Sequence, residues 1–269
     1  MLDLREHQAA RAWGPAIRGI TYNGSAGLIA RRLGTVTEGN VPPGSQILSL
    51  SEGEDLASAM REYAWRDGHW PAAVETPGGE RWLLGADPAV PGADAQAASR
   101  PTVPLRDAVV RGRVVLITGA AQGFGWALAK GLAREGAWIV VADRNVDGAK
   151  ARARELDQLS AAARGDHASG EAAPVRHLAL GVDVSDEASV SEMVGAITDH
   201  YGGLDLVVSN AGVVRSAGVT ELSADDFAFV TRVNYTGFFL VTKHCAPVLA
   251  AQDESWRSYR AAVATAWAG

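Results

Sequence analysis

A glycine-rich run is the part of this 269-residue chain best suited to chemistry: Thr118-Gly119-Ala120-Ala121-Gln122-Gly123-Phe124-Gly125. The run follows the apolar stretch 114–118 and opens an amphipathic stretch, 124–135, whose Leu128 and Leu132 we expect to face a sheet. Glycines at such a turn let the backbone bend sharply and let a pyrophosphate reach the amide groups, while the start of the helix offers N–H donors. The spacing predicts a phosphate-binding turn, and the alternative is a tight strand-to-helix turn that binds nothing.

An acidic residue, Asp143, stands at the end of the next apolar run, 138–142. Dinucleotide-binding folds place a carboxylate about 20 residues after the glycines, where it accepts hydrogen bonds from the adenosine ribose. The same carboxylate would repel a 2′-phosphate, so Asp143 favours NAD over NADP as the cofactor. Arg144 beside it weakens that preference, and either a cofactor contact or a solvent-facing position fits this arginine.

Apolar runs and amphipathic stretches alternate from Val110 onward. The runs predict strands over 114–118, 138–142, 175–184 and 204–210, and the stretches predict helices over 124–135, 147–159 and 187–201. Strands that are apolar throughout and separated by helices indicate a parallel sheet buried on both faces. We therefore predict an α/β fold with a Rossmann-type, doubly wound parallel sheet.

The chain changes character near residue 100. An Ala-, Pro- and Gly-rich stretch, 85–104, predicts a linker between a small α+β segment over 1–84 and a dinucleotide-binding domain over 105–269. Within the first segment we expect a helix over 54–68, where Leu56, Met60 and Tyr63 or Ala64 follow helical spacing.

Five motifs in this order resemble the short-chain dehydrogenase/reductase family. They are Thr118-Gly-x-x-x-Gly-x-Gly125, Asp143, Asp183-Val184, Ser209-Asn210-Ala211-Gly212 and Val233-Asn234-x-x-Gly237-x-Phe239. The resemblance covers about residues 105–250 and implies an NAD(P)(H)-dependent oxidoreductase that interconverts an alcohol and a carbonyl. A sugar alcohol or a sugar phosphate is one candidate substrate.

The resemblance also implies roles for individual residues. The implied cofactor-binding residues are Gly119, Ala121, Gln122, Gly123, Phe124, Gly125, Asp143, Arg144, Asp183, Val184, Asn210, Ala211 and Gly212. The turn would border the pyrophosphate, Asp183 and Val184 the adenine, and 210–212 the central section of the cofactor. Asp183 also fits a helix cap or turn, for which Ser185 is an equal candidate, and Asn210 also fits a strand-end turn.

Asn234 lies in a predicted helical stretch whose Val233, Gly237, Leu240 or Val241, and Cys245 can face inward. In the resembling family, the matching asparagine steadies a water-linked proton path to a catalytic pair, so Asn234 is our candidate catalytic residue. Because asparagine inside a helix is mildly unfavourable, we expect it to have a buried partner. Lys243 and His244 further along are expected at the surface.

The family's proton donor is a tyrosine followed four residues later by a lysine, with a serine on the strand before them. Here Tyr259 is followed four residues later by Val263, and no fifth strand is evident in 251–269. We therefore expect a sheet that is incomplete on its C-terminal side and a chain that represents the cofactor half of such an enzyme. Three alternatives stay open: a truncated gene product, a noncatalytic dinucleotide-binding or interaction module, and an unstably folded product with an open sheet edge.

The amino-acid composition favours some classes of binding partner and cellular location over others. Twenty-five basic against 31 acidic residues give a net charge of −6, which argues against nucleic acid and favours a small-molecule substrate. The single cysteine excludes an intrachain disulfide, and the absence of a signal or spanning segment favours a cytoplasmic location. A homo-oligomer is left open. Residues 35–90 faintly resemble the end of a class II aldolase-like module, but without a His-x-His pair we predict no metal site.

Overall fold

The computed structural model describes residues 4–21, 28–35, 45–85, 110–164 and 175–266. Two compact units make up the chain. Met1–Arg113, Ala196–Asp205 and Val248–Gly269 form unit 1, and Val114–Gly195 with Leu206–Pro247 form unit 2. The predicted linker falls, from residue 86 on, outside the described residues. The domain boundaries at 84 and 105 stay predictions.

Unit 2 contains a four-stranded sheet in which every neighbouring pair is parallel. Its strands are β5 (Val114–Thr118), β6 (Trp138–Asp143), β7 (Leu178–Gly181) and β8 (Leu206–Val208), in the order β7-β6-β5-β8. Every residue of β5 is buried, as an apolar run between two helical layers requires. The predicted α/β, Rossmann-type fold is confirmed. Within the described part of the chain, no strand follows β8.

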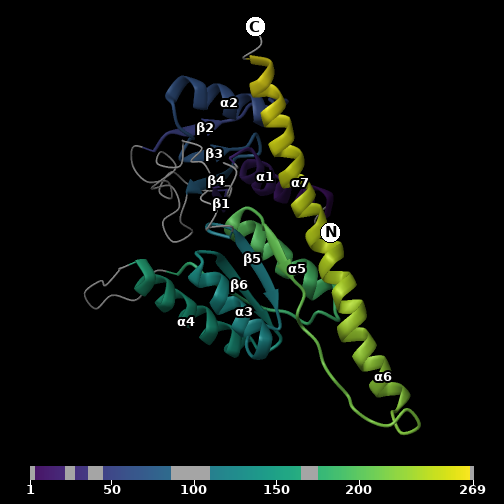
Figure 1. Cartoon of the computed structure of the whole chain (residues 1–269). Coiled ribbons are helices and arrows are strands. Elements are labelled where there is room, and N and C mark those ends of the chain that lie inside the picture. Colours follow the sequence, from purple (N-terminus) through teal and green to yellow (C-terminus); the bar gives the residue numbers. More distant parts are fainter. Residues whose placement is uncertain (1–3, 22–27, 36–44, 86–109, 165–174, 267–269) are drawn as a thin grey trace. The chain divides into compact units, whose positions relative to one another are not determined.

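The helices of this unit follow the strands in alternation. They are α3 (Gly123–Arg134), α4 (Val146–Arg164), α5 (Glu187–Tyr201), α6 (Ala224–Thr231), the π-helix η2 (Arg232–Thr236) and α7 (Gly237–Ala266). Figure 1 shows α3 and α4 side by side against the sheet, with α5 on the other side of β5. Both α5 and α7 continue into unit 1, and α7 crosses the boundary at Pro247, where a backbone N–H is missing.

The inward face of α3 differs from the expected one. Its buried residues are Gly125, Trp126, Ala129 and Ala133, whereas Leu128 is 45% exposed. Gly125, Ala129 and Ala133 recur every four residues, and small side chains at that spacing let the helix lie close to the sheet. The expectation that Leu128 faces the sheet was therefore wrong.

Unit 1 holds a mixed sheet with the strand order β1-β4-β3-β2. The strands are β1 (Ile29–Thr35), β2 (Ile47–Ser49), β3 (Ala73–Glu75) and β4 (Glu80–Gly85), and the helices are α1 (Leu4–Ile20) and α2 (Leu56–Asp67). The predicted helix over 54–68 is confirmed: Asp55 caps it by accepting from Ser58 N, and Gly68 ends it in a left-handed conformation. Met60, Trp82 and Leu84 are fully buried in the core of this unit.

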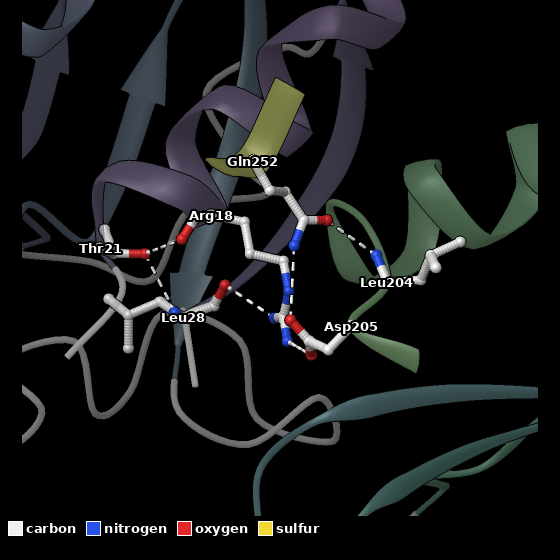
Figure 2. Close-up of polar contacts among 6 residues, drawn as sticks. All are labelled: Arg18, Thr21, Leu28, Leu204, Asp205 and Gln252. Atoms are coloured by element: carbon white, nitrogen blue, oxygen red, sulfur yellow. Dashed lines mark hydrogen bonds and ion pairs between the residues drawn. The ribbon is translucent and has the colours of Figure 1, made fainter. Parts of the chain in front are cut away.

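A buried arginine joins three separate segments within unit 1. Figure 2 shows Arg18 of α1 reaching Asp205, with an Nη2–Oδ2 distance of 2.5 Å, while its Nη1 donates to the carbonyl of Leu28 at 3.1 Å. Gln252 of α7 completes the cluster, because its Oε1 accepts from Leu204 N at 2.9 Å. The side chain of Arg18 is 0% exposed. A charge this deeply buried depends on its partners.

The residues that the structure describes include neither a helix that could span a membrane nor a cluster of side chains that could hold a metal ion. None of their helices has the length and apolar character needed to span a bilayer. No three of their His, Cys, Asp or Glu side chains gather as a metal site would require.

We expect Arg18→Met to lower the free energy of unfolding of unit 1 by about 3 kcal/mol, because it leaves the Asp205 carboxylate without its buried cation. Urea unfolding followed by circular dichroism measures this. Arg154→Met, at an exposed arginine of α4, removes the same charge as a control. Equal unfolding midpoints for the two variants would contradict the importance of this ion pair.

Candidate nucleotide-binding site

A cavity of about 570 Å³ lies in unit 2, at the carboxyl ends of the parallel strands. Its lining residues are Gly119, Gln122, Gly123, Phe124, Asp143, Arg144, Val182, Asp183, Val184, Ser185, Asn210, Ala211, Gly212, Val213, Phe229, Arg232 and Val233. In chain order the sheet runs 3-2-1-4, so the direction of winding reverses beside β5. Open α/β sheets bind ligands at this switch point.

Most of the residues singled out from the sequence meet at this cavity. Of the predicted cofactor residues, only Ala121 and Gly125 do not line it; both are buried in the turn. Asn234 does not line it either. Phe229, Arg232 and Val233 line it without having been predicted, because they come from a helical face whose orientation the sequence did not reveal.

The glycines of the turn serve two different purposes. A Cβ at Gly119 would lie 2.9 Å from the Cα of Ala211, and one at Gly125 would lie 2.5 Å from the carbonyl oxygen of Gly119. These two positions allow backbone segments to pack closely. At Gly123, where φ is +56°, a Cβ would meet no atom within 4 Å. This last position leaves open space beside the first turn of α3.

The start of α3 can receive an anion. Gln122, its N-cap residue, makes no side-chain capping hydrogen bond, and Gln122, Gly123 and Phe124 all line the cavity. The first N–H groups of a helix lack intrahelical partners and lie at the positive end of its dipole. The turn therefore combines free space with donors, as a phosphate group requires.

Asp143 fixes the turn from the end of β6. Its Oδ2 accepts from Ala121 N and its Oδ1 accepts from Asn145 N, each at 2.9 Å. A carboxylate can accept about four hydrogen bonds, so both oxygens retain capacity for ligand hydroxyls. Asp143 thus lines the cavity and also holds the turn, a second role that the sequence did not indicate.

Asp183 lines the cavity and organises the turn after β7. Its Oδ1 accepts from the backbone N and the hydroxyl of Ser185, at 2.9 and 2.6 Å, and these hydrogen bonds lower the pKa of the Asp183 carboxyl. The Nε of Arg144 lies 4.0 Å from Oδ2, on a side chain that is 80% exposed. The helix cap belongs to neither Asp183 nor Ser185: Asp186 accepts from the first amides of α5.

A buried hydroxyl joins the ends of β5 and β8. Thr118 Oγ1 accepts from the backbone N of Asn210 at 3.0 Å and of Ala211 at 3.1 Å. In return, Asn210 Nδ2 donates to the carbonyls of Thr118 and Gly119, at 2.9 and 3.2 Å. The strand-end role and the cavity-lining position of Asn210 therefore coexist. This role of Thr118 was not predicted from the sequence, although a hydroxyl that ends an apolar strand was a usable signal.

Asn234 lies in the π-helix η2 and holds the loop after β8. Its Oδ1 accepts from Val213 N at 2.8 Å, and its Nδ2 donates to Val213 O at 2.9 Å. Asn234 itself is exposed, so the expected buried partner was wrong: the partner is loop backbone. Single-turn π-helices of this kind are common at functional sites. A catalytic role for Asn234 stays a prediction.

Cys245, Lys243 and His244 of α7 do not line the cavity. Burial raises the pKa of the Cys245 thiol to about 12, which keeps it protonated. Lys243 Nζ and His244 Nε2 lie 2.6 and 3.1 Å from Glu187 Oε1, where they link α7 to the start of α5. Gly237, Leu240, Val241 and Cys245 are buried, as expected.

Comparison with known proteins identifies the family. The family model for short chain dehydrogenase matches residues 113–255, more than half of the chain. This chain belongs to the short-chain dehydrogenase family. It is 37% identical over 130 residues to D-threitol dehydrogenase of Mycolicibacterium smegmatis, a match that covers 48% of this chain and 45% of that protein. It is 31% identical over 140 residues to sorbitol dehydrogenase of Cereibacter sphaeroides, covering 52% and 48%.

Among solved structures, L-sorbose reductase from Gluconobacter frateurii, complexed with NADPH and L-sorbose, is 29% identical. The TM-score is 0.47, and the match covers 54% of this chain and 51% of that one. This short-chain dehydrogenase chain spans about half the length of the curated relatives that it matches.

Thr118→Val should destabilise the site by about 2 kcal/mol, because it leaves two partly buried N–H groups without their acceptor. Thr118→Ser, the matched control, keeps the hydroxyl and should lose only about 1 kcal/mol for the methyl group. Hydrogen–deuterium exchange of the amides of Asn210 and Ala211 measures the difference. Faster exchange in the valine variant alone is expected, and equal protection in both variants would contradict it.

Proposed function

We propose that the cavity of unit 2 binds NAD(H) and that the chain is the cofactor-binding part of an alcohol/carbonyl oxidoreductase. The single observation that carries this is the open space at Gly123, beside a helix start whose cap residue makes no side-chain hydrogen bond. The left-handed φ of +56° favours glycine at this position in any case, and the free space at its Cβ position is what lets a diphosphate approach the helix start. When bound, the nicotinamide supplies or accepts a hydride.

Each part of the dinucleotide has residues suited to it. The first turn of α3, from Gln122 to Phe124, would hold the diphosphate, and Asp143 would accept from the adenosine ribose. Asp183 and Val184 would border the adenine, and 210–212 would border the central section. Asn234 would keep that last segment in place through its two hydrogen bonds to Val213.

NAD is favoured over NADP by the charge at the end of β6. Asp143 presents a carboxylate to the cavity, and a 2′-phosphate there would meet like charge. Arg144 is the opposing feature, because its exposed guanidinium could turn toward a phosphate. Its neighbour Asp183 competes for that guanidinium at 4.0 Å. The preference therefore rests on the balance of these three side chains.

For the substrate, we propose a sugar alcohol or a sugar phosphate. The names of relatives support the sugar alcohol: one is a D-threitol dehydrogenase and another a sorbitol dehydrogenase. The proton donor is the part that these 269 residues lack by sequence, since Tyr259 has Val263 where the family pattern has lysine. In the family pattern, that lysine lowers the pKa of the tyrosine so that the phenol can transfer a proton near neutral pH. The same observation favours a second candidate, a noncatalytic dinucleotide-binding or interaction module.

Binding of NADH, measured by calorimetry, should weaken at least tenfold in both Asp143→Ala and Gly123→Val. The first change removes the ribose acceptor and an anchor of the turn, and the second fills the space for the diphosphate. Glu135→Ala, at the far end of α3, should bind as the wild type does. Asp143→Ala should also lower the ratio of the NADPH dissociation constant to the NADH dissociation constant. Unchanged affinity in both site variants would refute the proposed binding site.

Turnover tests the noncatalytic candidate. We expect this chain to bind NADH but not to oxidise it with a panel of ketoses and ketose phosphates, because the tyrosine–lysine pair is missing from it. The measurement is the loss of absorbance of NADH. Turnover by the purified chain would exclude the noncatalytic module and would require a proton donor other than a Tyr-x-x-x-Lys pair.

A further inference from the structure

We propose that Arg152 of α4 is a positioning residue that orients the glycine-rich turn for the diphosphate, although it does not line the cavity. The inference rests on the proposed function and deepens it. Nothing in the sequence motif points to this arginine, which lies well beyond the glycines and Asp143.

The carbonyl of Ala121 is the point at which Arg152 acts. Arg152 Nε donates to Ala121 O at 3.1 Å, and the N–H of the same residue donates to Asp143 Oδ2 at 2.9 Å. Both polar backbone groups of residue 121 are thus fixed from outside the turn. In a planar trans peptide, the carbonyl and the following N–H point in opposite directions. Holding the Ala121 carbonyl toward α4 therefore sets the direction of the Gln122 N–H, on a residue that lines the cavity.

Three contacts hold the guanidinium itself. Its Cζ lies 4.7 Å from the centroid of the Trp126 ring, and its Nη1 lies 2.8 Å from Glu155 Oε2. Trp126 is buried, so the ring provides a fixed surface. A planar guanidinium that is stacked and paired in this way loses little further freedom when it donates to a carbonyl.

A glycine lets α4 approach the turn. A Cβ at Gly148 would lie 3.2 Å from the Cβ of Ala121, so the first turn of α4 passes close to residue 121. Arg152 follows four residues later, on the same face of the helix. Asn145 fixes the start of α4: it accepts from Gly148 N and donates its own N–H to Asp143 Oδ1. Hydrogen bonds thereby connect the turn at Ala121 to α4 in two ways, through Asp143, which binds the start of the helix, and through Arg152 further along it.

Lys130 provides a natural comparison. Its Nζ also lies over Trp126, 5.1 Å from the ring centroid, but no described hydrogen bond joins it to the turn. The two cations share an aromatic partner and differ in their link to Ala121. Arg154, an exposed arginine of α4 that donates to the carbonyl of Lys150, controls for the loss of a positive charge on that helix.

The experiment compares the full chain with its Arg152→Met, Lys130→Met and Arg154→Met variants. Dissociation constants are measured by calorimetry for NADH and for ADP-ribose, which contains the diphosphate without the nicotinamide. Adenosine, which lacks the diphosphate, is titrated by NMR. We expect Arg152→Met to weaken NADH and ADP-ribose at least tenfold and adenosine less than twofold. Lys130→Met and Arg154→Met should change each constant less than twofold.

Two results would overturn the inference. One is an equal effect of all three substitutions, which would make the effect one of net charge. The other is a parallel loss of adenosine binding in Arg152→Met, which would mean a general collapse of the site. If Arg152→Met does not fold, Arg152→Lys replaces it, because lysine keeps the charge and a donor. We expect Arg152→Lys to weaken NADH binding less than tenfold with an unchanged melting temperature. Wild-type affinity in this variant would count against the role of Arg152. Failure of the wild type to bind NADH or ADP-ribose would instead defeat the proposed function itself.

Discussion

The end of β5 lies so close to the chain after β8 that no side chain fits between them. A Cβ at Gly119 would lie 2.9 Å from the Cα of Ala211. The Thr118 hydroxyl accepts hydrogen bonds from the backbone N–H groups of Asn210 and Ala211 in that segment. This close approach brings the glycine-rich turn and residues 210–212 to the same cavity. Because close-packed backbone cannot adjust to an inserted atom, the site depends on a glycine at position 119, as it also does at Gly125.

Asp143 and α4 supply the second constraint on the turn. The carboxylate binds one amide of the turn and one at the start of α4, so a single side chain fixes the spacing between them. Each carboxylate oxygen can still accept a hydrogen bond from a ligand, so the structural contacts do not occupy the whole carboxylate. Asp143, a proposed binding residue, is thus also a structural residue, and its substitution is expected to alter both properties.

Unit 1 follows a different design from the parallel sheet of unit 2. Its mixed sheet packs on α1 and α2, and it takes in two segments, 196–205 and 248–269, that follow the glycine motif in sequence. Arg18, Asp205 and Gln252 join these segments through buried polar contacts. Residues of the matched family region therefore contribute to the fold of the first unit as well as to the second.

The sequence alone determined the strands at 114–118 and 138–142 and the glycine-rich turn after the first of them, for which phosphate binding is our proposal. Continuous apolar runs and closely spaced glycines are local signals, and each has few structural solutions. Tertiary structure alone decided which side chains meet: Thr118 with Asn210 across 92 residues, Arg152 with Ala121, and Asn234 with Val213. It also turned Leu128 outward in favour of smaller neighbours. Such contacts depend on how helices pack against the sheet, which the local periodicity of a single chain does not encode.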